Sequence, residues 1–293
     1  MKHAYLIIAH HEFQLLEYLI RSLDDIRNDI YIHFDKKVKQ LPTLFTQHAK
    51  LIILDNRVDV RWGDVSQIKS EFVLFRAAFE RNSYGYYHLL SGVDIPLKTQ
   101  DQIHDFFYRN KGKEFIGFNQ EVTESEINKK VRSFHFFPKL FRNSNAVIAL
   151  LVKCVRSVTV LFQQSVKMYR HCNIEFKKGT SWVSVTHDFV HFLLKKEEET
   201  LKIYKNTFCG DEFFLHTLCW NSSFRQALFN LNNEVIGCQR KINWSNGKLY
   251  DWEEKDFDVL VTSKVLFARK FNSKDINFVR RMYAAVKNGG SGS

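Results

Sequence analysis

The sequence Ala4-Tyr5-Leu6-Ile7-Ile8-Ala9 decides the fold class. It is a continuous apolar run rich in strand-forming residues, which predicts a buried β-strand. The amphipathic stretch from Phe13 to Leu23 predicts a helix, and Asp29–Phe34 and Leu51–Leu54 predict the next two strands. Strands that alternate with helices at this spacing form a parallel sheet covered by helices, so we expect an α/β fold.

Further elements are expected later in the chain. The segments 86–90 and 114–118 have the composition of strands, and 179–186 reads as a turn that leads into a strand. A helix is expected over 187–194, and the apolar run at 208–220 has the spacing of a buried helix. These elements extend the same sheet and its helical cover.

The composition is that of a globular protein. Of the 293 residues, 45% are hydrophobic and 15% aromatic, and the formal net charge is +11. Such a charge attracts anions, which include nucleic acid, acidic lipid and the phosphates of nucleotide sugars. No nucleic-acid-binding motif is visible, so nucleic acid is not an expected partner. We expect a single domain over 1–288, followed by an artificial linker at Gly289–Ser293.

The cysteines and the first residues predict a cytoplasmic protein. Five cysteines are scattered without a CxxC pair, so neither a zinc site nor a disulfide framework is indicated and a reducing compartment fits best. The first strand begins close to Met1, which leaves no room for a signal peptide. No uninterrupted apolar run approaches the roughly 20 residues of a membrane span.

Polar and aromatic residues follow the predicted strands. His10 and His11 come after the first, Asp35 and two lysines after the second, Trp62 after the third and Asp94 after the fourth. Ligands bind beyond the carboxyl ends of parallel strands, so these side chains are expected around one crevice. An aspartate there is suited to bind a ribose or the edge of a base, and an indole is suited to stack on a ring. The alternative is that they are ordinary strand-end and turn residues.

Three features in the second half of the chain are also candidates. Asp211 and Glu212 open a buried helix, where acids either favour the helix start or do chemistry. Trp182 suits the apolar face of a sugar or, equally, the core. Lys270 lies in Phe-rich sequence, where a cation is costly unless it meets an anion or reaches water.

The segment 129–170 is basic and apolar, and it predicts a helical insertion over about 125–175. It suits either a helical hairpin packed on the sheet or peripheral contact with an anionic bilayer. We favour packing, because apolar positions this dense need a protein partner on more than one face.

Seven blocks, taken in order, carry a resemblance to a known family. They are 4–11, 32–37, 91–96, 179–186, 211–214, 240–244 and 266–271. With them the chain resembles, over nearly all of residues 3–285, the core-2/I-branching β-1,6-N-acetylglucosaminyltransferases, whose relatives include peptide O-xylosyltransferases. The segment 122–178 matches the animal pattern poorly.

The resemblance implies an inverting GT-A-type glycosyltransferase that uses a UDP-sugar and needs neither a metal nor another cofactor. N-acetylglucosamine is the expected sugar, and an oligosaccharide or glycolipid is the expected acceptor. The animal enzymes carry a membrane anchor, a stem and several disulfides, which we do not expect in this chain in that form. A bacterial enzyme of surface polysaccharide synthesis is therefore expected, either cytoplasmic or peripheral on the inner face of the membrane.

The resemblance also assigns roles to residues. Glu212 falls on the family's general base, and Arg240 and Lys270 fall on the cations that hold the diphosphate. Asp94 occupies the region where metal-dependent relatives carry an Asp-x-Asp pair. Asp211 is expected to cap and orient the helix, and Trp182 and Asp211 are expected to contact the acceptor. The nucleotide contacts fall on Ala9, His10, His11 and Asp35, with Trp62 beside them.

Three alternatives stay open at this point. The first is a UDP-xylose-dependent transferase of the same family. The second is a non-catalytic basic module that binds nucleic acid or acidic polysaccharide, and the third is a scaffold that uses 129–170 on a membrane surface.

Overall fold

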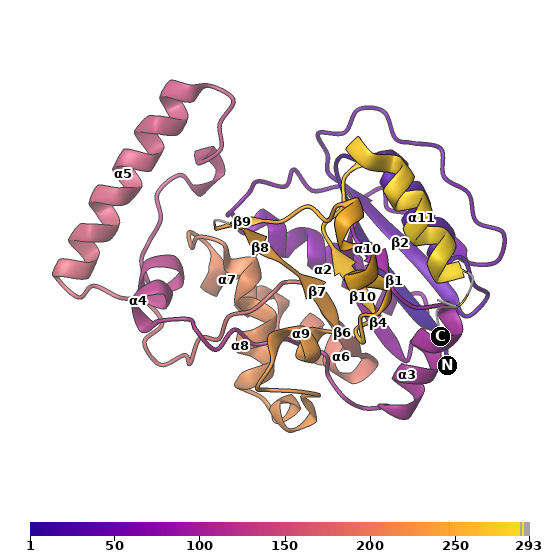
Figure 1. Cartoon of the computed structure of the whole chain (residues 1–293). Helices are drawn as coiled ribbons and strands as arrows, with labels where there is room; N and C mark the ends of the chain where they lie inside the picture. Colours follow the sequence, from indigo (N-terminus) through magenta and orange to yellow (C-terminus); the bar gives the residue numbers. More distant parts are fainter. Residues whose placement is uncertain (246, 288, 290–293) are drawn as a thin grey trace.

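A computed structural model describes residues 1–245, 247–287 and 289. Its main sheet has the strand order β3-β2-β1-β4-β6. The strands are β1 (His3–Ala9), β2 (Asn28–Phe34), β3 (Lys50–Ile53), β4 (Tyr86–Ser91) and β6 (Ser184–Thr186). The first four are parallel, and β6 runs antiparallel to β4. The predicted α/β fold with a mostly parallel sheet is confirmed, and it is consistent with a GT-A-like fold (Figure 1).

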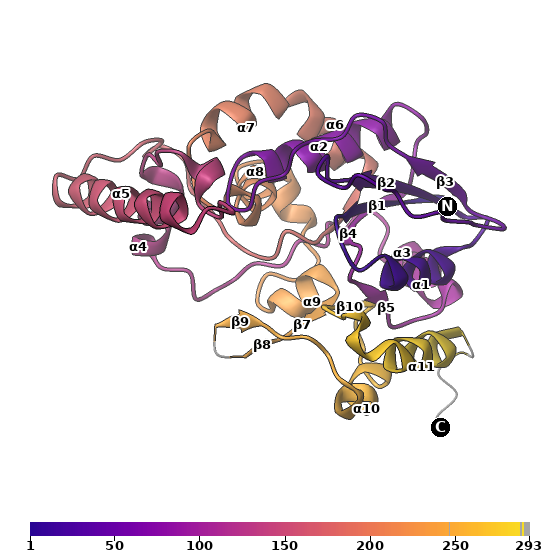
Figure 2. The same ribbon diagram turned by 90° about the horizontal axis from the view of Figure 1, so that it is seen from above.

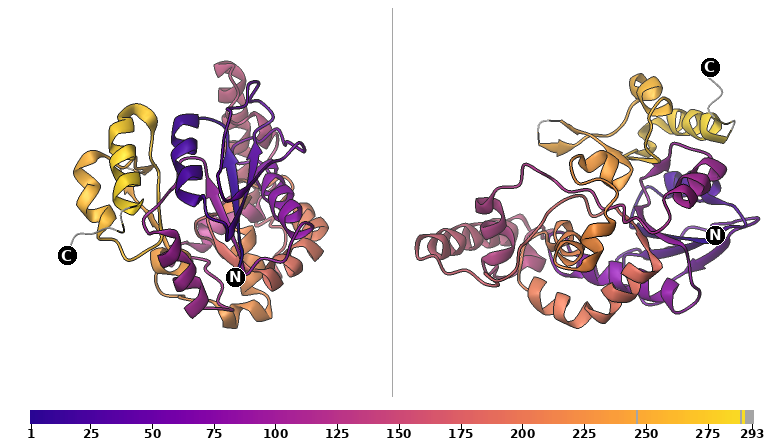
Figure 3. Two further views of the ribbon diagram at one scale, coloured as in Figure 1. Left: turned by 90° about the vertical axis from the view of Figure 1, so that its right-hand side faces the viewer. Right: turned by 90° about the horizontal axis from the view of Figure 1, so that it is seen from below.

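Alternate residues of β1 pack on opposite sides of this sheet. Ala4 and Leu6 join a core with α2 (Ser66–Phe79), α6 (His187–Lys195) and α8 (Phe214–Trp220). Tyr5 and Ile7 join another with α1 (Phe13–Leu23) and α3 (Gln100–Arg109). Because both faces are covered, the strand is apolar without alternation, which is why its sequence is a continuous apolar run. Figure 3 shows the sheet between these two helical layers.

A second sheet brings the end of the chain beside β4. It has the order β5-β10-β7, with β5 (Ile95–Pro96), β10 (Phe267–Arg269) and β7 (Arg240–Ile242). The amide of Leu97 donates to the carbonyl of Leu266 at 2.8 Å. The loop after β4 and the strand that ends at Arg269 therefore meet.

The remaining elements include two longer helices, α5 and α11, and several short ones. They are α4 (Glu124–Ile127), η1 (Asn128–Arg132), η2 (Pro138–Leu140), α5 (Ala146–Ser165), α7 (Glu197–Tyr204), η3 (Gly210–Glu212), η4 (Ser223–Ala227), α9 (Glu234–Cys238), β8 (Trp244–Ser245), β9 (Lys248–Leu249), η5 (Glu254–Asp256), α10 (Phe257–Val261), η6 (Ser273–Asp275) and α11 (Ile276–Lys287).

The strand expected at 114–118 does not form. Glu114 and Phe115 make only isolated bridges, to Leu228 and Ser184. At Gly117 the backbone passes so close to α9 that a Cβ would lie 2.3 Å from the carbonyl oxygen of Glu234. This close approach leaves no room for a neighbouring strand.

The insertion contains one long helix, α5, instead of a helical hairpin. Figures 1 and 2 show α5 projecting from the body of the protein. Of its residues only Val152, Val160 and Gln163 are buried, so the expectation that its apolar side chains pack against protein is wrong. By length and composition alone, α5 could also cross a membrane. The domain limits stay predictions, and residues 290–293 of the expected linker lie outside the described residues.

Candidate active site

A cavity of about 680 Å³ lies beyond the carboxyl ends of β1, β2 and β4. Eight of the predicted site residues line it, namely Ala9, His10, His11, Asp35, Trp62, Trp182, Asp211 and Lys270. Three others, Asp94, Glu212 and Arg240, are not among the lining residues. Glu71, Arg142 and Arg269 line the cavity without having been predicted.

The two histidines form one wall. Their rings are stacked with centroids 4.1 Å apart. Partial desolvation lowers the pKa of both histidines. The neighbouring His11 also lowers the pKa of His10, and the charge of Lys270 also lowers that of His11. Both imidazoles are therefore neutral at pH 7, where they contribute hydrogen bonds instead of charge.

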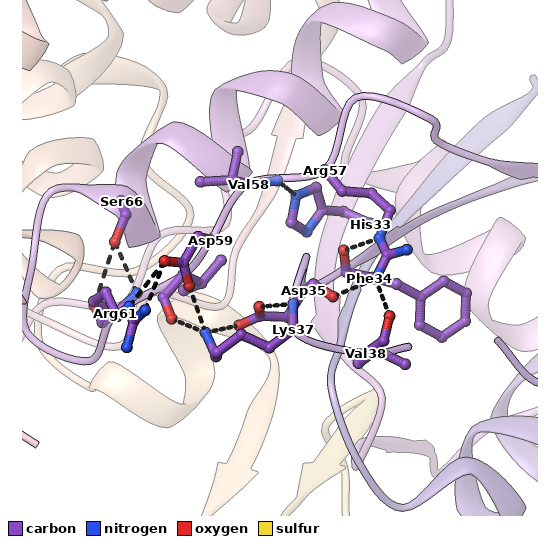
Figure 4. A network of polar contacts seen from close by, with 11 residues as sticks. His33, Phe34, Asp35, Lys37, Val38, Arg57, Val58, Asp59, Arg61 and Ser66 are labelled. Carbon is purple, nitrogen blue, oxygen red and sulfur yellow. Dashed lines mark hydrogen bonds and ion pairs between the residues drawn. The ribbon is translucent and has the colours of Figure 1, made fainter. Parts of the chain in front are cut away.

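Asp35 is fixed by a network of charged residues, drawn in Figure 4. Its carboxylate accepts from the Lys37 amide at 2.9 Å and from Lys37 Nζ at 2.6 Å. The same ammonium lies 3.1 Å from Asp59, which also pairs with Arg61. Lys37 is therefore held by two acids and is not free to face a phosphate. Asp35 itself lies rigidly at the cavity wall.

Trp62 is partly covered by the insertion. Its ring lies 5.6 Å from that of Phe141, and the Arg142 guanidinium lies 3.7 Å from the ring centroid. The indole remains 38% exposed. The predicted stacking surface therefore exists, and residues of the insertion share it.

Two buried acids, Asp211 and Glu71, lie in the cavity wall. Asp211 does not cap α8, contrary to expectation, because its carboxylate accepts from Gln67 Nε2 at 2.9 Å and Ser181 Oγ at 3.3 Å. Burial, with the charge of Glu212 next, raises the pKa of Asp211 to about 7. Burial and the charge of Asp211 raise the pKa of Glu71 well above its ordinary value.

One oxygen of each acid, Asp211 Oδ1 and Glu71 Oε2, is buried without a hydrogen-bond partner in the described part of the chain. The sequence signal for Glu71 was an acid on the otherwise apolar face of α2, which buries Ile68, Phe72 and Phe75. A buried acid on such a face is unusual unless it is paired or has a task.

Glu212 points away from this acid pair. Its carboxylate lies 3.0 Å from Lys130 Nζ and 3.5 Å from Lys178 Nζ, and both lysines also pair with Glu126. Asp211 and Glu212 lie in the 3₁₀ turn η3. Successive side chains of a 3₁₀ helix diverge by about 120°, so the two neighbours face different surroundings.

Arg240 also lies elsewhere than predicted. Its side chain is 1% exposed, and the guanidinium donates to the backbone carbonyls of Cys238, Leu89 and Val183, the last at 2.7 Å. Burial lowers its pKa to about 10. Because the guanidinium joins β7 to β4 and to the segment before β6, the structure gives it a packing environment instead of a place in the cavity.

Arg269 occupies the position expected of Arg240. Its guanidinium lies 4.0 Å from the Trp182 ring centroid, and its Nε is buried without a hydrogen-bond partner in the described residues. The next residue, Lys270, also lines the cavity, with Nζ 3.5 Å from Asp251. Adjacency to Lys270 was the only sequence signal for Arg269.

Asp94 lies behind Arg269. It is 1% exposed, and its carboxylate accepts from the amide and the hydroxyl of Ser91 at 3.0 and 2.8 Å. Burial raises its pKa, and the charge of Arg269 opposes this. Asp94 therefore positions the cation and does not itself reach the cavity. Within residues 1–245, 247–287 and 289, no three His, Cys, Asp or Glu side chains gather as a metal site would need.

Aromatic rings, two neighbouring cations and buried acids surround one cavity at the carboxyl ends of a mostly parallel sheet, which is where α/β folds bind ligands. The architecture is consistent with a GT-A-like fold. The sequence model of the family described as Core-2/I-Branching enzyme matches residues 3–268, so the chain belongs to this family of glycosyltransferases.

Curated relatives are similar over most of the chain. Xylosyltransferase 2 from Rattus norvegicus and from Homo sapiens are each 22% identical to it, over 92% of this chain and 32% of the relative. Xylosyltransferase oxt from Drosophila melanogaster is 21% identical, over 86% of this chain and 30% of the relative. The chain thus spans about a third of the length of these relatives.

Proposed function

We propose that this glycosyltransferase moves a sugar from a UDP-sugar to a hydroxyl of a glycan acceptor, with inversion at the anomeric carbon. The observation that carries the proposal is the cavity itself, which is lined by the cations Arg269 and Lys270 and by the acids Asp211 and Glu71. The cations suit the two phosphates of the leaving UDP. The acids suit the incoming hydroxyl.

In a one-step inversion the acceptor hydroxyl attacks the anomeric carbon while UDP leaves from the opposite face. The new C–O bond forms as the C–O bond to the diphosphate breaks, and the hydroxyl proton passes to a carboxylate. Fixed guanidinium and ammonium groups stabilise the charge that develops on the diphosphate. Arg269, buried at the cavity wall and held by Asp94, suits this task.

The base is one of two neighbouring carboxylates. The family resemblance assigns it to Glu212, whereas the geometry favours Asp211, which lines the cavity and keeps one unpaired oxygen. A pKa of about 7 suits Asp211 to general-base catalysis at neutral pH. Glu212, whose carboxylate is paired with Lys130 and Lys178, raises the pKa of its neighbour.

The family resemblance of the sequence supports N-acetylglucosamine as the sugar, and the names of the similar curated proteins support xylose as the second candidate. Membership of a glycosyltransferase family argues against a purely non-catalytic binding module. A cytoplasmic location remains part of the proposal. It is supported by five cysteines that are all free thiols.

One assay tests the proposal. The purified chain is incubated with UDP-N-acetylglucosamine, UDP-xylose and other UDP-sugars, with EDTA or with manganese, and UDP release and thermal stabilisation are measured. We expect one UDP-sugar to be hydrolysed slowly and to stabilise the fold, with or without EDTA. Activity that depends wholly on manganese would refute the metal-independent mechanism, and no response to any UDP-sugar would refute the proposed donor class.

A further inference from the structure

Helix α5 presents an apolar surface that no described part of the chain covers. Phe137, just before the helix, and Val147, Leu150, Val158, Leu161 and Phe162 within it are each 59–66% exposed. We call these six residues the α5 surface. A contiguous apolar patch on a soluble domain usually marks a site of interaction.

The charge around this surface has one sign. Between Ile127 and Ile174 the sequence contains no Asp or Glu. It contains nine basic residues, Lys129, Lys130, Arg132, Lys139, Arg142, Lys153, Arg156, Lys167 and Arg170. An apolar helix face among cations fits a partner that is apolar inside and anionic outside.

Contacts near both ends of α5 hold it to neighbouring segments of the chain. At its carboxyl-terminal end Gln163 bonds the backbone of Phe134, and the Arg170 amide donates to the Arg132 carbonyl. Before its amino-terminal end, Phe141 and Arg142 rest on Trp62. Protein segments therefore contact the chain at both ends of the helix, whereas a spanning helix would place its ends on opposite sides of a bilayer.

The middle of α5 is held in the same way. The Arg156 guanidinium lies 3.9 Å from the Phe208 ring centroid, and its Nε donates to His135 at 3.2 Å. One face of the helix thus contacts the protein, while the apolar residues of the α5 surface are exposed. That is the geometry of a helix that lies in the plane of a membrane interface.

We propose that the α5 surface docks on a bilayer that contains anionic phospholipids. Charge complementarity favours this partner over a second copy of the chain. A symmetric pair joined through this surface would bring two sets of cations together without an acid between Ile127 and Ile174 of either copy.

The docking surface lies beside the cavity. Lys139 and Arg142, which precede α5, both line the cavity, and Arg142 covers Trp62. A bilayer under α5 would therefore bring the cavity close to glycans attached to membrane lipids. This step rests on the proposed function, and it assigns the acceptor to the class of lipid-anchored glycans.

Vesicle co-sedimentation of the full chain tests the docking. The vesicles contain phosphatidylcholine alone or mixed with phosphatidylglycerol, at low and high salt. We expect binding to the mixed vesicles that weakens with salt. The triple variant Leu150→Gln, Val158→Gln, Leu161→Gln should bind them at least about tenfold more weakly, because it removes apolar side chains that would enter the interface.

A matched control changes three exposed apolar residues elsewhere. Ile26→Gln, Tyr108→Gln, Val259→Gln should bind vesicles like the unchanged chain, since these residues lie outside the insertion. Equal binding by both triple variants would overturn the proposal, as would a dimer in light scattering that the α5 variant abolishes while vesicles are never bound. UDP-sugar stabilisation of the α5 variant is read separately, so a failed docking surface is distinguished from a failed donor assignment.

Discussion

Asp94 Oδ1 lies 3.6 Å from Arg269 Nε, and both side chains are almost fully buried. Asp94 follows β4, whereas Arg269 ends β10, so this contact joins residues that are distant in sequence. It fixes a guanidinium that would otherwise be costly to bury, and it leaves that group at the cavity wall beside Trp182.

The first prediction concerns this cation. Arg269→Ala should weaken UDP binding roughly tenfold or more, because a charge-assisted contact to the diphosphate is lost. Lys270→Ala should weaken it in the same direction. Calorimetric titration with UDP measures both. Arg240→Met is the comparison, since it should lower thermal stability while the folded protein keeps its affinity for UDP. An unchanged affinity in Arg269→Ala would remove this residue from the donor site.

The second prediction separates the two candidate bases. Asp211→Asn should lower turnover roughly 100-fold or more while donor binding is kept, because the amide cannot accept the hydroxyl proton. Glu212→Gln should have a smaller effect on turnover and should shift the acidic limb of the pH profile downward, since it removes the charge that helps to raise the pKa of Asp211. The reverse ranking of the two variants would return the role of base to Glu212.

The third prediction concerns Glu71, whose pKa is raised by burial. The folded protein keeps the carboxyl proton of Glu71 at a pH where the unfolded chain has lost it. The free energy of unfolding therefore falls as the pH rises above about 4, the pKa of Glu in the unfolded chain. Glu71→Gln carries no titrating proton. Urea unfolding should show the variant gaining stability relative to the unchanged chain between about pH 5 and pH 8. A difference that does not vary with pH would show that Glu71 is ionised in the fold.

The fourth prediction concerns the buried histidines His3, His88 and His104. His88 Nε2 lies 3.0 Å from His3 Nδ1, and the His104 ring stacks on that of His3 at 4.1 Å. Burial lowers the pKa of all three, that of His104 to about 4.

Because the folded pKa values lie below the unfolded value of about 6.5, stability is complete above that pH and is lost as the pH falls. For each histidine that stays neutral in the folded protein, the free energy of unfolding should fall by about 1.4 kcal/mol for each pH unit below about 6.5. His104→Gln should reduce this slope in urea unfolding. Identical slopes in the variant and the unchanged chain would mean that His104 does not titrate as described.

Most of the sheet could be read from the chain. The limits of α1 agree with the prediction, and β1 to β4 differ from it by a few residues at most, because a strand buried on both faces leaves a continuous apolar run that needs no partner to be recognised. The crevice residues after these strands, such as His10 and Asp35, followed from the rule that parallel strands end at one edge. The prediction of a strand at 114–118 was wrong, because the neighbouring segments, and not the residues of 114–118 themselves, decide whether it pairs.

What the sequence by itself determined was the fold class, the family and the edge of the sheet that holds the site, since periodicity and ordered motifs are local properties of the chain. Only the tertiary structure decided which charged side chain faces the cavity. Asp211 and Glu212 are neighbours, yet a 3₁₀ turn directs one to the cavity and the other to Lys130 and Lys178. In the same way, Arg240 is directed to backbone carbonyls while Arg269 lines the cavity. The direction of a side chain is set by contacts with segments far away in the chain, which no local pattern records.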